Sequence, residues 1–458
     1  MEGIICGPSA LSYLRTPPQV LDLLPSIPIS QDRATQTFIS TSPAFKELFG
    51  ETVHTLVSSV SEHTNAEHIK QHLWSGPLPP QATIDDPAVG TVTSPLLTLL
   101  TLAQHCTDIE LAMIMHEFCG EFAVYRPSDE VEKALPKTND ARLAYGWERA
   151  PSKDTRPSSL WQRSQLVEPH ELASFAREVR GHRGARRFER AAAMLQGVTL
   201  SPLEVRTALL MGLPRTLGGR GIKIETNATI RFTQAASKIA HRSYCIADIL
   251  ITSPDGTHVV DVECQGASVH DGIEARISDA DRTTALESMG VSVILVSHDQ
   301  IASHDSFNVV MDLVERELGQ RLPAQTSRMV KSEEALRGDL FQEWETLGMA
   351  QNDGKVDASA RTRAEAKAKA KARDGAKAAA KPGTQNTRPR RTPSRQQRPR
   401  PRRQPWPNPS RPPSASYSAR ANAKANEPGP QCEVMTFCVS YQRTSEKPSS
   451  CTRFSAAC

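Results

Sequence analysis

Three acidic residues lie in two short apolar segments of the 458-residue chain, where an unpartnered charge would be costly. Asp248 interrupts the apolar residues 246–251, and Asp261 and Glu263 alternate with valines in residues 259–265. Carboxylate oxygens are the ligands that Mg²⁺ and similar hard cations prefer, and such a cation can activate water for hydrolysis. We therefore predict that Asp248 and Glu263 bind a divalent metal.

Local structure would bring these residues together. Side chains two positions apart on a strand face the same side, so Asp261, Glu263 and Gln265 share one face of a strand over 258–265. The sequence Ser-Pro-Asp-Gly at residues 253–256 predicts a hairpin turn from a preceding strand over 244–252. Folding this hairpin would place Asp248 near Glu263.

The surrounding residues predict further elements in a definite order. Proline and glycine positions and apolar periodicity indicate an α/β arrangement of helix, three strands, helix, strand and helix. The predicted elements are a helix over 201–212, strands near 222–232, 244–252 and 258–265, a helix over 272–289, a strand over 291–296 and a helix over 305–319.

This order and these residues resemble the PD-(D/E)XK nuclease superfamily, whose core is αβββαβ, and most of all its very-short-patch-repair endonuclease-like branch. The shared pattern covers residues 201–320. It consists of Asp248, then Glu263-Cys264-Gln265-Gly266 with a nearby His270, then Asp279 and Arg282, and finally Leu286 and Gly290. The resemblance implies a restriction-endonuclease-like core.

The resemblance also implies roles. Asp248 and Glu263 would bind Mg²⁺ (or Mn²⁺) with help from the carbonyl of Cys264, for metal-dependent hydrolysis of DNA in genome defence or repair. Gln265 stands where the superfamily usually has lysine. It could hold water by hydrogen bonds but supplies no charge. His270 could act as general base or acid, because its free pKa is near neutrality.

A second function class stays open beside the nuclease. Residues 1–320 are also similar to uncharacterised actinobacterial proteins related to abortive-infection antitoxin-like regulators. A catalytically inactive DNA-binding or regulatory module could retain the fold, and a weaker alternative assigns DNA binding to residues 1–125. Metal binding by Asp248 and Glu263 distinguishes an intact site from a degenerate one.

Several of these residues have structural interpretations of equal or greater weight. Glu204 could be a further metal ligand, or it could form a helix-capping box with Ser201. His270 is as well explained as a loop residue. Asp261 is expected to face solvent or to support a ligand. Gly218-Gly219-Arg220-Gly221 lacks the Gly-Lys-Ser/Thr ending of a nucleotide-binding loop, which favours a turn over a phosphate-binding loop.

Basic residues raise the same kind of alternative. Arg282 could hold a phosphate or pair with Asp279 three residues earlier on the same helix, and Arg242 could pair with Asp248. A basic run over 169–200 includes Arg186 and Arg187, which could contact nucleic-acid phosphates or simply form a solvated helix face.

Composition divides the chain into four parts. We predict a mixed α/β domain over 1–125, a linker over 126–168, the nuclease-like domain with its leading basic helix over 169–325, and a disordered low-complexity tail over 326–458. Residues 355–424 hold 20 basic and three acidic residues, a charge of +17, so the rest carries −13 of the total of +4. The tail could bind nucleic acid weakly, whereas the acidic remainder is no general polyanion binder.

The remaining features concern location. The start of the chain has no signal-peptide pattern, and no apolar run reaches the roughly 18 residues of a membrane span. Nine cysteines without a C-x-x-C pair indicate reduced thiols. We therefore expect a cytoplasmic protein with DNA as partner and no membrane contact, of undetermined oligomeric state.

Overall fold

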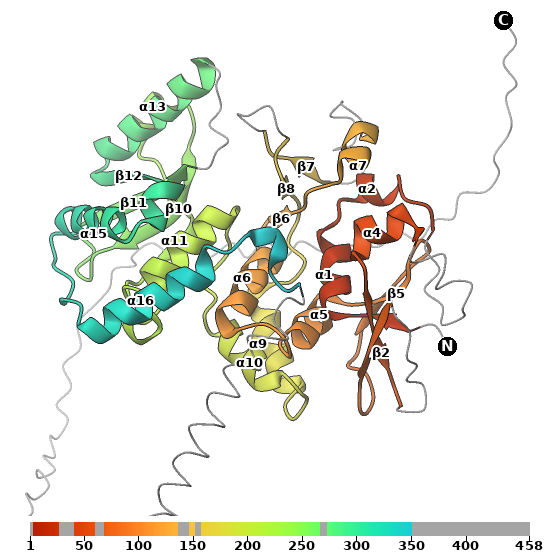
Figure 1. Cartoon of the computed structure of the whole chain (residues 1–458). Helices are drawn as coiled ribbons and strands as arrows, with labels where there is room; N and C mark the ends of the chain where they lie inside the picture. Colours follow the sequence, from red (N-terminus) through yellow and green to blue (C-terminus); the bar gives the residue numbers. More distant parts are fainter. Residues whose placement is uncertain are drawn as a thin grey trace, which may run out of the picture. The chain divides into compact units, whose positions relative to one another are not determined.

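A mixed four-stranded sheet in the C-terminal half carries the acidic residues. The computed structural model describes residues 3–26, 41–59, 68–135, 146–151, 157–265 and 273–349 (Figure 1). The strand order is β12-β11-β10-β9; β10 pairs antiparallel with β9 and β11, and β12 lies parallel to β11. The strands are β9 (Glu225–Arg231), β10 (Tyr244–Thr252), β11 (Val259–Gln265) and β12 (Val291–Ser297).

The predicted hairpin joins β10 to β11. Ser253 accepts a hydrogen bond from the His258 amide at 2.9 Å and donates one to Asp255 at 2.6 Å. Gly256 adopts a positive φ of 73°, which favours glycine because it has no Cβ. The β10–β11 register pairs Thr252 with Val259 and Ile249 with Val262.

Helices cover both faces of this sheet. The buried Val260 and Val262 belong to the same apolar cluster as Phe307 of α15, whereas Val259 packs beside Leu286 of α13. Figure 1 shows α13 on one side of the sheet and α11 and α15 on the other. The helices are α11 (Pro202–Gly212), α12 (Gln234–Ala240), α13 (Ile273–Ser288), α14 (His298–Ala302) and α15 (His304–Glu317).

The N-terminal part contains a second sheet, of order β3-β2-β1-β5-β4. Its parallel β2–β3 pair is packed with the helices by a cluster that includes Phe45 and Val53. The elements are β1 (Ile4–Ile5), α1 (Gly7–Arg15), α2 (Pro18–Leu21), α4 (Pro43–Phe49), β2 (Val53–Val57), β3 (Ile69–Leu73), β4 (Thr83–Asp86), β5 (Gly90–Thr93) and α5 (Pro95–Leu102). The N-terminal part is therefore mixed α/β, as expected.

The segment predicted as a linker contains regular structure. β8 (Leu160–Gln162) pairs with β6 (Phe122–Val124) and with β7 (Glu148–Arg149), and α7 spans Asp129–Ala134. Trp161 is buried and donates to the Tyr125 carbonyl at 3.1 Å. The expectation of a structureless segment is wrong for these residues, because Trp161 supplies an apolar anchor within a polar sequence.

The basic helices pack with the N-terminal helices and do not lead into the four-stranded sheet of β9 to β12. α10 (Ala185–Ala192) packs against α6 (Asp108–Cys119), α5 and α9 (Pro169–Glu178). Its buried face includes Phe188, whereas Arg190 reaches Asp108 of α6 at 2.6 Å and Arg186 is exposed. α6 begins after Thr107, which forms a capping box with Glu110.

Folded structure extends past the position where we predicted the tail to begin. α16 (Ser327–Leu340) and the short 3-10 helix η3 (Trp344–Thr346) follow α15, and Leu340, Trp344 and Leu347 are buried. Residues 350–458 lie outside the described residues. The prediction of a disordered tail is wrong for residues 327–347, because the apolar residues of 336–347 pack on elements distant in sequence.

A buried carboxylate joins these distant elements. Glu117 of α6 has no exposed surface and accepts a bidentate hydrogen bond from Arg15 of α1, at 2.9 and 2.6 Å. It also accepts from the Trp344 indole at 2.8 Å and from the Val124 amide at 3.3 Å. Arg15 reaches the Leu347 carbonyl at 3.1 Å. The described residues accordingly lie within one compact unit, Met1–Lys381.

None of the helices in the described residues combines the length and the apolar character that a membrane crossing requires.

The Glu117 contacts predict a large stability effect. Glu117→Gln should lower the free energy of unfolding by about 3–5 kcal/mol, because it leaves the buried Arg15 guanidinium without its charge partner. Arg126→Ala removes an exposed pair with Glu345 and should cost less than about 1 kcal/mol. Urea denaturation of both variants measures the difference. Equal effects would contradict the central role of Glu117.

Candidate acidic site

The acidic residues lie where β10 and β11 separate. The pairing of these strands extends to Ile249 and Val262, and at the next position the Asp248 carboxylate accepts from the Cys264 amide at 2.8 Å. β10 remains paired with β9 as far as Tyr244, while β11 remains paired with β12 as far as Gln265. A side chain therefore takes over the hydrogen bonding at the point where the two central strands part.

Arg282 of α13 fills this position with a positive charge. Its guanidinium makes a bidentate contact with Glu263, one bond of which is 3.0 Å, and it donates to the Ile246 carbonyl at 2.8 Å. Asp261 lies 3.5 Å from the same guanidinium. Burial lowers the pKa of Arg282, but its contact with Glu263 outweighs this effect and raises it. The predicted pair with Asp279 is wrong, because Asp279 is exposed and Arg282 turns toward the sheet.

Asp261 is the least compensated residue of the group. Its side chain is fully buried, and neither of its oxygens has a hydrogen-bond partner. Burial, followed by the charge of Glu263, raises the pKa of Asp261 to about 8. The expectation that Asp261 faces solvent is wrong: α13 covers this face of the sheet, which alternation along β11 alone does not reveal.

Asp248 and Glu204 influence each other across the same region. Burial, followed by the charge of Glu263, raises the pKa of Asp248 to about 6. Burial, followed by the charge of Asp248, raises the pKa of Glu204 to about 8. Arg242 is not the partner of Asp248, since it donates to Ser278 at 2.6 Å.

The alternative of a capping box is met in part: Ser201 caps α11, but the Glu204 side chain accepts from the Leu200 amide and the Ser201 hydroxyl instead of the Ser201 amide. The Ser201 hydroxyl accepts from the Glu204 amide at 3.3 Å and donates to Glu204 Oε1 at 2.8 Å. The Leu200 amide donates to Glu204 Oε2 at 2.6 Å. Both carboxylate oxygens are therefore engaged at the start of α11, and a metal would have to compete with these donors.

The other predicted residues have varied positions. Gln265 is exposed at the end of β11, and the thiol of Cys264 points to Thr207 of α11 at 3.6 Å. His270 lies outside the described residues, as does Gly266. Within the described residues, no set of three or more His, Cys, Asp and Glu side chains has an arrangement suited to holding a metal ion. Arg282 engages Glu263, and the residues at the start of α11 engage both oxygens of Glu204.

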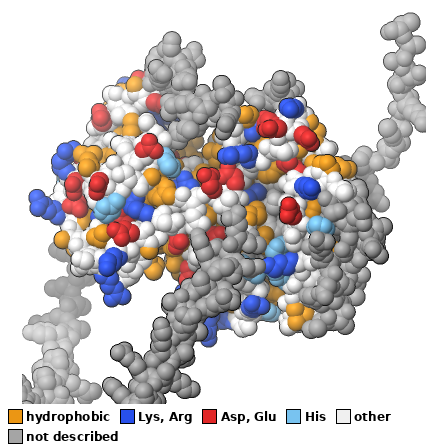
Figure 2. Space-filling model, in the orientation of Figure 1, with side chains coloured by type: hydrophobic (Ala, Val, Ile, Leu, Met, Phe, Trp, Pro, Cys, Tyr) orange, Lys and Arg blue, Asp and Glu red, His pale blue; other side chains and the backbone are white. Residues whose placement is uncertain are grey.

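The arginines predicted to contact nucleic acid differ in their availability. Arg187 donates to the Ala103 carbonyl at 3.0 Å and lies 3.3 Å from Asp108, so internal contacts occupy it. Arg186 is exposed on α10. Figure 2 shows acidic and basic side chains interspersed over the face that it presents, without one continuous basic surface.

Comparison with known proteins identified no matching protein family, curated protein or solved structure.

The raised pKa of Asp261 predicts how stability depends on pH. The unfolded chain releases this proton near pH 4, whereas the folded chain retains it to about pH 8, so stability falls as the pH rises through that window. Asp261→Asn cannot ionise. It should therefore gain stability relative to the natural chain as the pH rises, by at least about 1 kcal/mol at pH 8.

Thermal unfolding at several pH values between about 5 and 8 measures this difference. Asp255→Asn is the matched control, because Asp255 is an exposed acid in the turn of the same hairpin and its pKa is lowered to about 2 by hydrogen bonds from Ser253 and Thr257. The control should show no change over this range. A stability difference for Asp261→Asn that is constant with pH would rule out the assigned titration.

Proposed function

We propose that the chain is a metal-dependent nuclease that hydrolyses DNA phosphodiester bonds, with Asp248 and Glu263 as its metal ligands. One observation carries the proposal: two carboxylates meet where the central strands part, and the described residues supply a single guanidinium, Arg282, against Asp261 and Glu263 together. The order α11, β9, β10, β11, α13 and β12, with α12 inserted between β9 and β10, supports a restriction-endonuclease-like core.

The carboxylate oxygens are of the chemical type that a hard divalent cation prefers, although no three of the described side chains are arranged to hold one as they stand. Asp261 has two buried oxygens without hydrogen-bond partners among the described residues, and the pKa values of Asp248 and Glu204 are raised by burial first and by neighbouring carboxylates second. A cation relieves both conditions, since it supplies charge where protons would otherwise be retained. Mg²⁺ or Mn²⁺, when bound, would supply an activated water and stabilise charge on the phosphate.

The residues of the chain would have distinct roles. Asp248 is held by the Cys264 amide through one oxygen, and its other oxygen would bind the metal. Glu263 becomes available when Arg282 releases it, and the released guanidinium could then contact a phosphate, for which a planar bidentate donor is suited. Gln265 is exposed at the end of β11 and could hold water by hydrogen bonds.

A regulatory or DNA-binding module without turnover is the second candidate. The bidentate Arg282–Glu263 contact favours it, because an internal cation already neutralises one proposed ligand. Two further features favour the module without turnover. Both oxygens of Glu204 are already engaged, and position 265 holds the uncharged Gln265. Metal binding separates the two candidates.

Cleavage by the full chain is the primary test. We expect nicking or cutting of supercoiled DNA with Mg²⁺ or Mn²⁺ and none with EDTA. Asp248→Asn and Glu263→Gln should each reduce the rate at least about 100-fold, because each removes a ligand charge. Asparagine at 248 still accepts from the Cys264 amide, so the strand geometry is kept.

Asp255→Asn again serves as control and should cleave like the natural chain, since Asp255 is in the exposed turn. Cleavage that persists in EDTA, or that is unchanged in both ligand variants, would refute the proposal. Folded protein without cleavage and without Mn²⁺ binding would establish the second candidate instead.

Metal affinity should rise with pH. Protons compete with the cation for Asp248, whose pKa is about 6, and for Glu204, whose pKa is about 8. Titration of Mn²⁺ followed by calorimetry should show binding that strengthens several-fold from about pH 5.5 to about pH 8. Affinity that stays constant or falls over this range would exclude these carboxyls as ligands.

A further inference from the structure

One surface of the four-stranded sheet is open beside the acidic site. Tyr244 of β10 pairs with Arg231 of β9, and Ile246 pairs with Thr229. Side chains of directly paired residues lie on the same face of a sheet, so these four form one surface, which we call the open face. All four are exposed, and Tyr244 and Ile246 retain 52% and 44% of their accessible surface.

A break in the alternation of β10 determines where the open face points. Ile249 is buried in the cluster that includes Phe307 of α15, whereas Cys245 is buried beside Leu286 of α13. Two residues four positions apart on a regular strand would face the same side, so β10 changes face between them. The change coincides with Asn227 of β9, whose φ is 53°. The open face is therefore on the side of the sheet away from α13.

The chain that forms the open face is basic. Residues 226–247 contain Arg231, Lys238 and Arg242 and no acidic residue. The Arg231 side chain is exposed and makes no ion pair or hydrogen bond within the part of the chain that the structure describes. A free guanidinium beside an exposed aromatic ring suits a nucleic-acid strand, because the first can bind a phosphate and the second can stack on a base.

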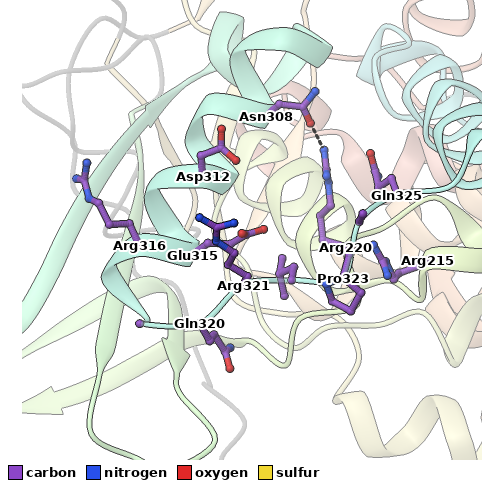
Figure 3. A pocket seen from close by; sticks show the side chains of 13 residues that line it. Arg215, Arg220, Asn308, Asp312, Glu315, Arg316, Gln320, Arg321, Pro323 and Gln325 are labelled. Carbon is purple, nitrogen blue, oxygen red and sulfur yellow. Dashed lines mark hydrogen bonds between the residues drawn. The ribbon is translucent and has the colours of Figure 1, made fainter.

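The arginines around the cavity at the end of α15 differ from Arg231 in this respect. Four arginines and two acids line that cavity of about 1000 Å³ (Figure 3). Arg220 pairs with Glu333 at 3.2 Å and Arg316 with Glu317 at 2.9 Å, so two arginines remain against the two acids. The charges of the cavity therefore balance, whereas the charge of Arg231 is not compensated.

The open face continues into the acidic site. Ile246 and Asp248 are two positions apart on β10, and Arg282 donates both to the Ile246 carbonyl at 2.8 Å and to Glu263 at 3.0 Å. At about 3.4 Å per residue, Tyr244 lies roughly 13 Å along the strand from Asp248. This distance corresponds to about four stacked nucleotides at about 3.4 Å each. A DNA strand with one phosphate at the acidic site would therefore reach the open face.

We propose that the open face binds unpaired nucleotides of a DNA strand, with Tyr244 stacking on a base and Arg231 contacting a phosphate. The inference rests on the proposed function for the identity of this strand as the one to be cut, whereas binding itself requires no metal. Unpaired nucleotides fit this surface better than a duplex does. Only an unpaired base offers its flat side to a tyrosine ring, and one free arginine supplies few contacts to a duplex backbone.

The test compares binding of single-stranded DNA with binding of a duplex of the same length by the full chain, in EDTA and at fixed ionic strength. Fluorescence anisotropy should show that Tyr244→Ala binds the single strand at least about fivefold more weakly, because a stacking surface is lost. Tyr244→Phe keeps the ring and should bind like the natural chain. Both variants should fold normally, since Tyr244 is exposed.

Arg231→Ala tests the phosphate contact, and Arg183→Ala is its matched control. Arg183 is exposed before α10, so its removal takes the same charge from a position far along the chain from the open face. The comparison corrects for DNA that binds to other basic parts of the chain. Arg231→Ala should weaken single-strand binding several-fold more than the control does.

Equal single-strand affinities of Tyr244→Ala and Tyr244→Phe would overturn the inference, as would equal affinities of Arg231→Ala and its control. An equal loss of duplex and single-strand binding in Tyr244→Ala would also overturn it, because stacking needs an unpaired base. The assay contains no metal ion, so its outcome is separate from that of the cleavage assay. Single-strand binding that depends on Tyr244, in a chain that cuts no DNA, would uphold the open face and refute the nuclease.

Discussion

The need to compensate a buried carboxylate links the beginning and the end of the described chain. Glu117 has no exposed surface, and its partners come from α1, from the end of β6 and from η3. Ionised side chains are tolerated in such a position only when charge and hydrogen bonds replace the lost water. The contacts of Glu117 with Arg15 and Trp344 therefore require residues more than 300 positions apart to fold together.

Glu333 meets the same requirement within the C-terminal half. It is fully buried. It accepts hydrogen bonds from Arg337 at 3.0 Å and Gln325 at 2.8 Å, and it lies 3.2 Å from Arg220 and 3.1 Å from His304. These partners fix α16 against α15 and the glycine-rich turn. The turn is thus held by Glu333 through Arg220.

The acidic site departs from this pattern of full compensation. Among the described residues, Arg282 is the one cation that contacts both Asp261 and Glu263, and Asp261 keeps two buried oxygens without hydrogen-bond partners there. When a protein compensates most of its buried charges but leaves one cluster incompletely compensated, that cluster is often where a ligand binds or a reaction occurs. This contrast within one chain is the physical ground for placing function at the end of β10 and β11.

The sequence by itself determined the strands of the four-stranded sheet and the approach of Asp248 to Glu263. Alternation of valines with acids and a Ser-Pro-Asp-Gly turn are local signals, and β10 and β11 follow them closely. Tertiary structure alone decided what those acids contact. The burial of Asp261, the turn of Arg282 away from Asp279 and the occupied oxygens of Glu204 depend on α11 and α13. Sequence spacing cannot reveal such contacts, because packing between distant elements sets both the burial of a charge and its partner.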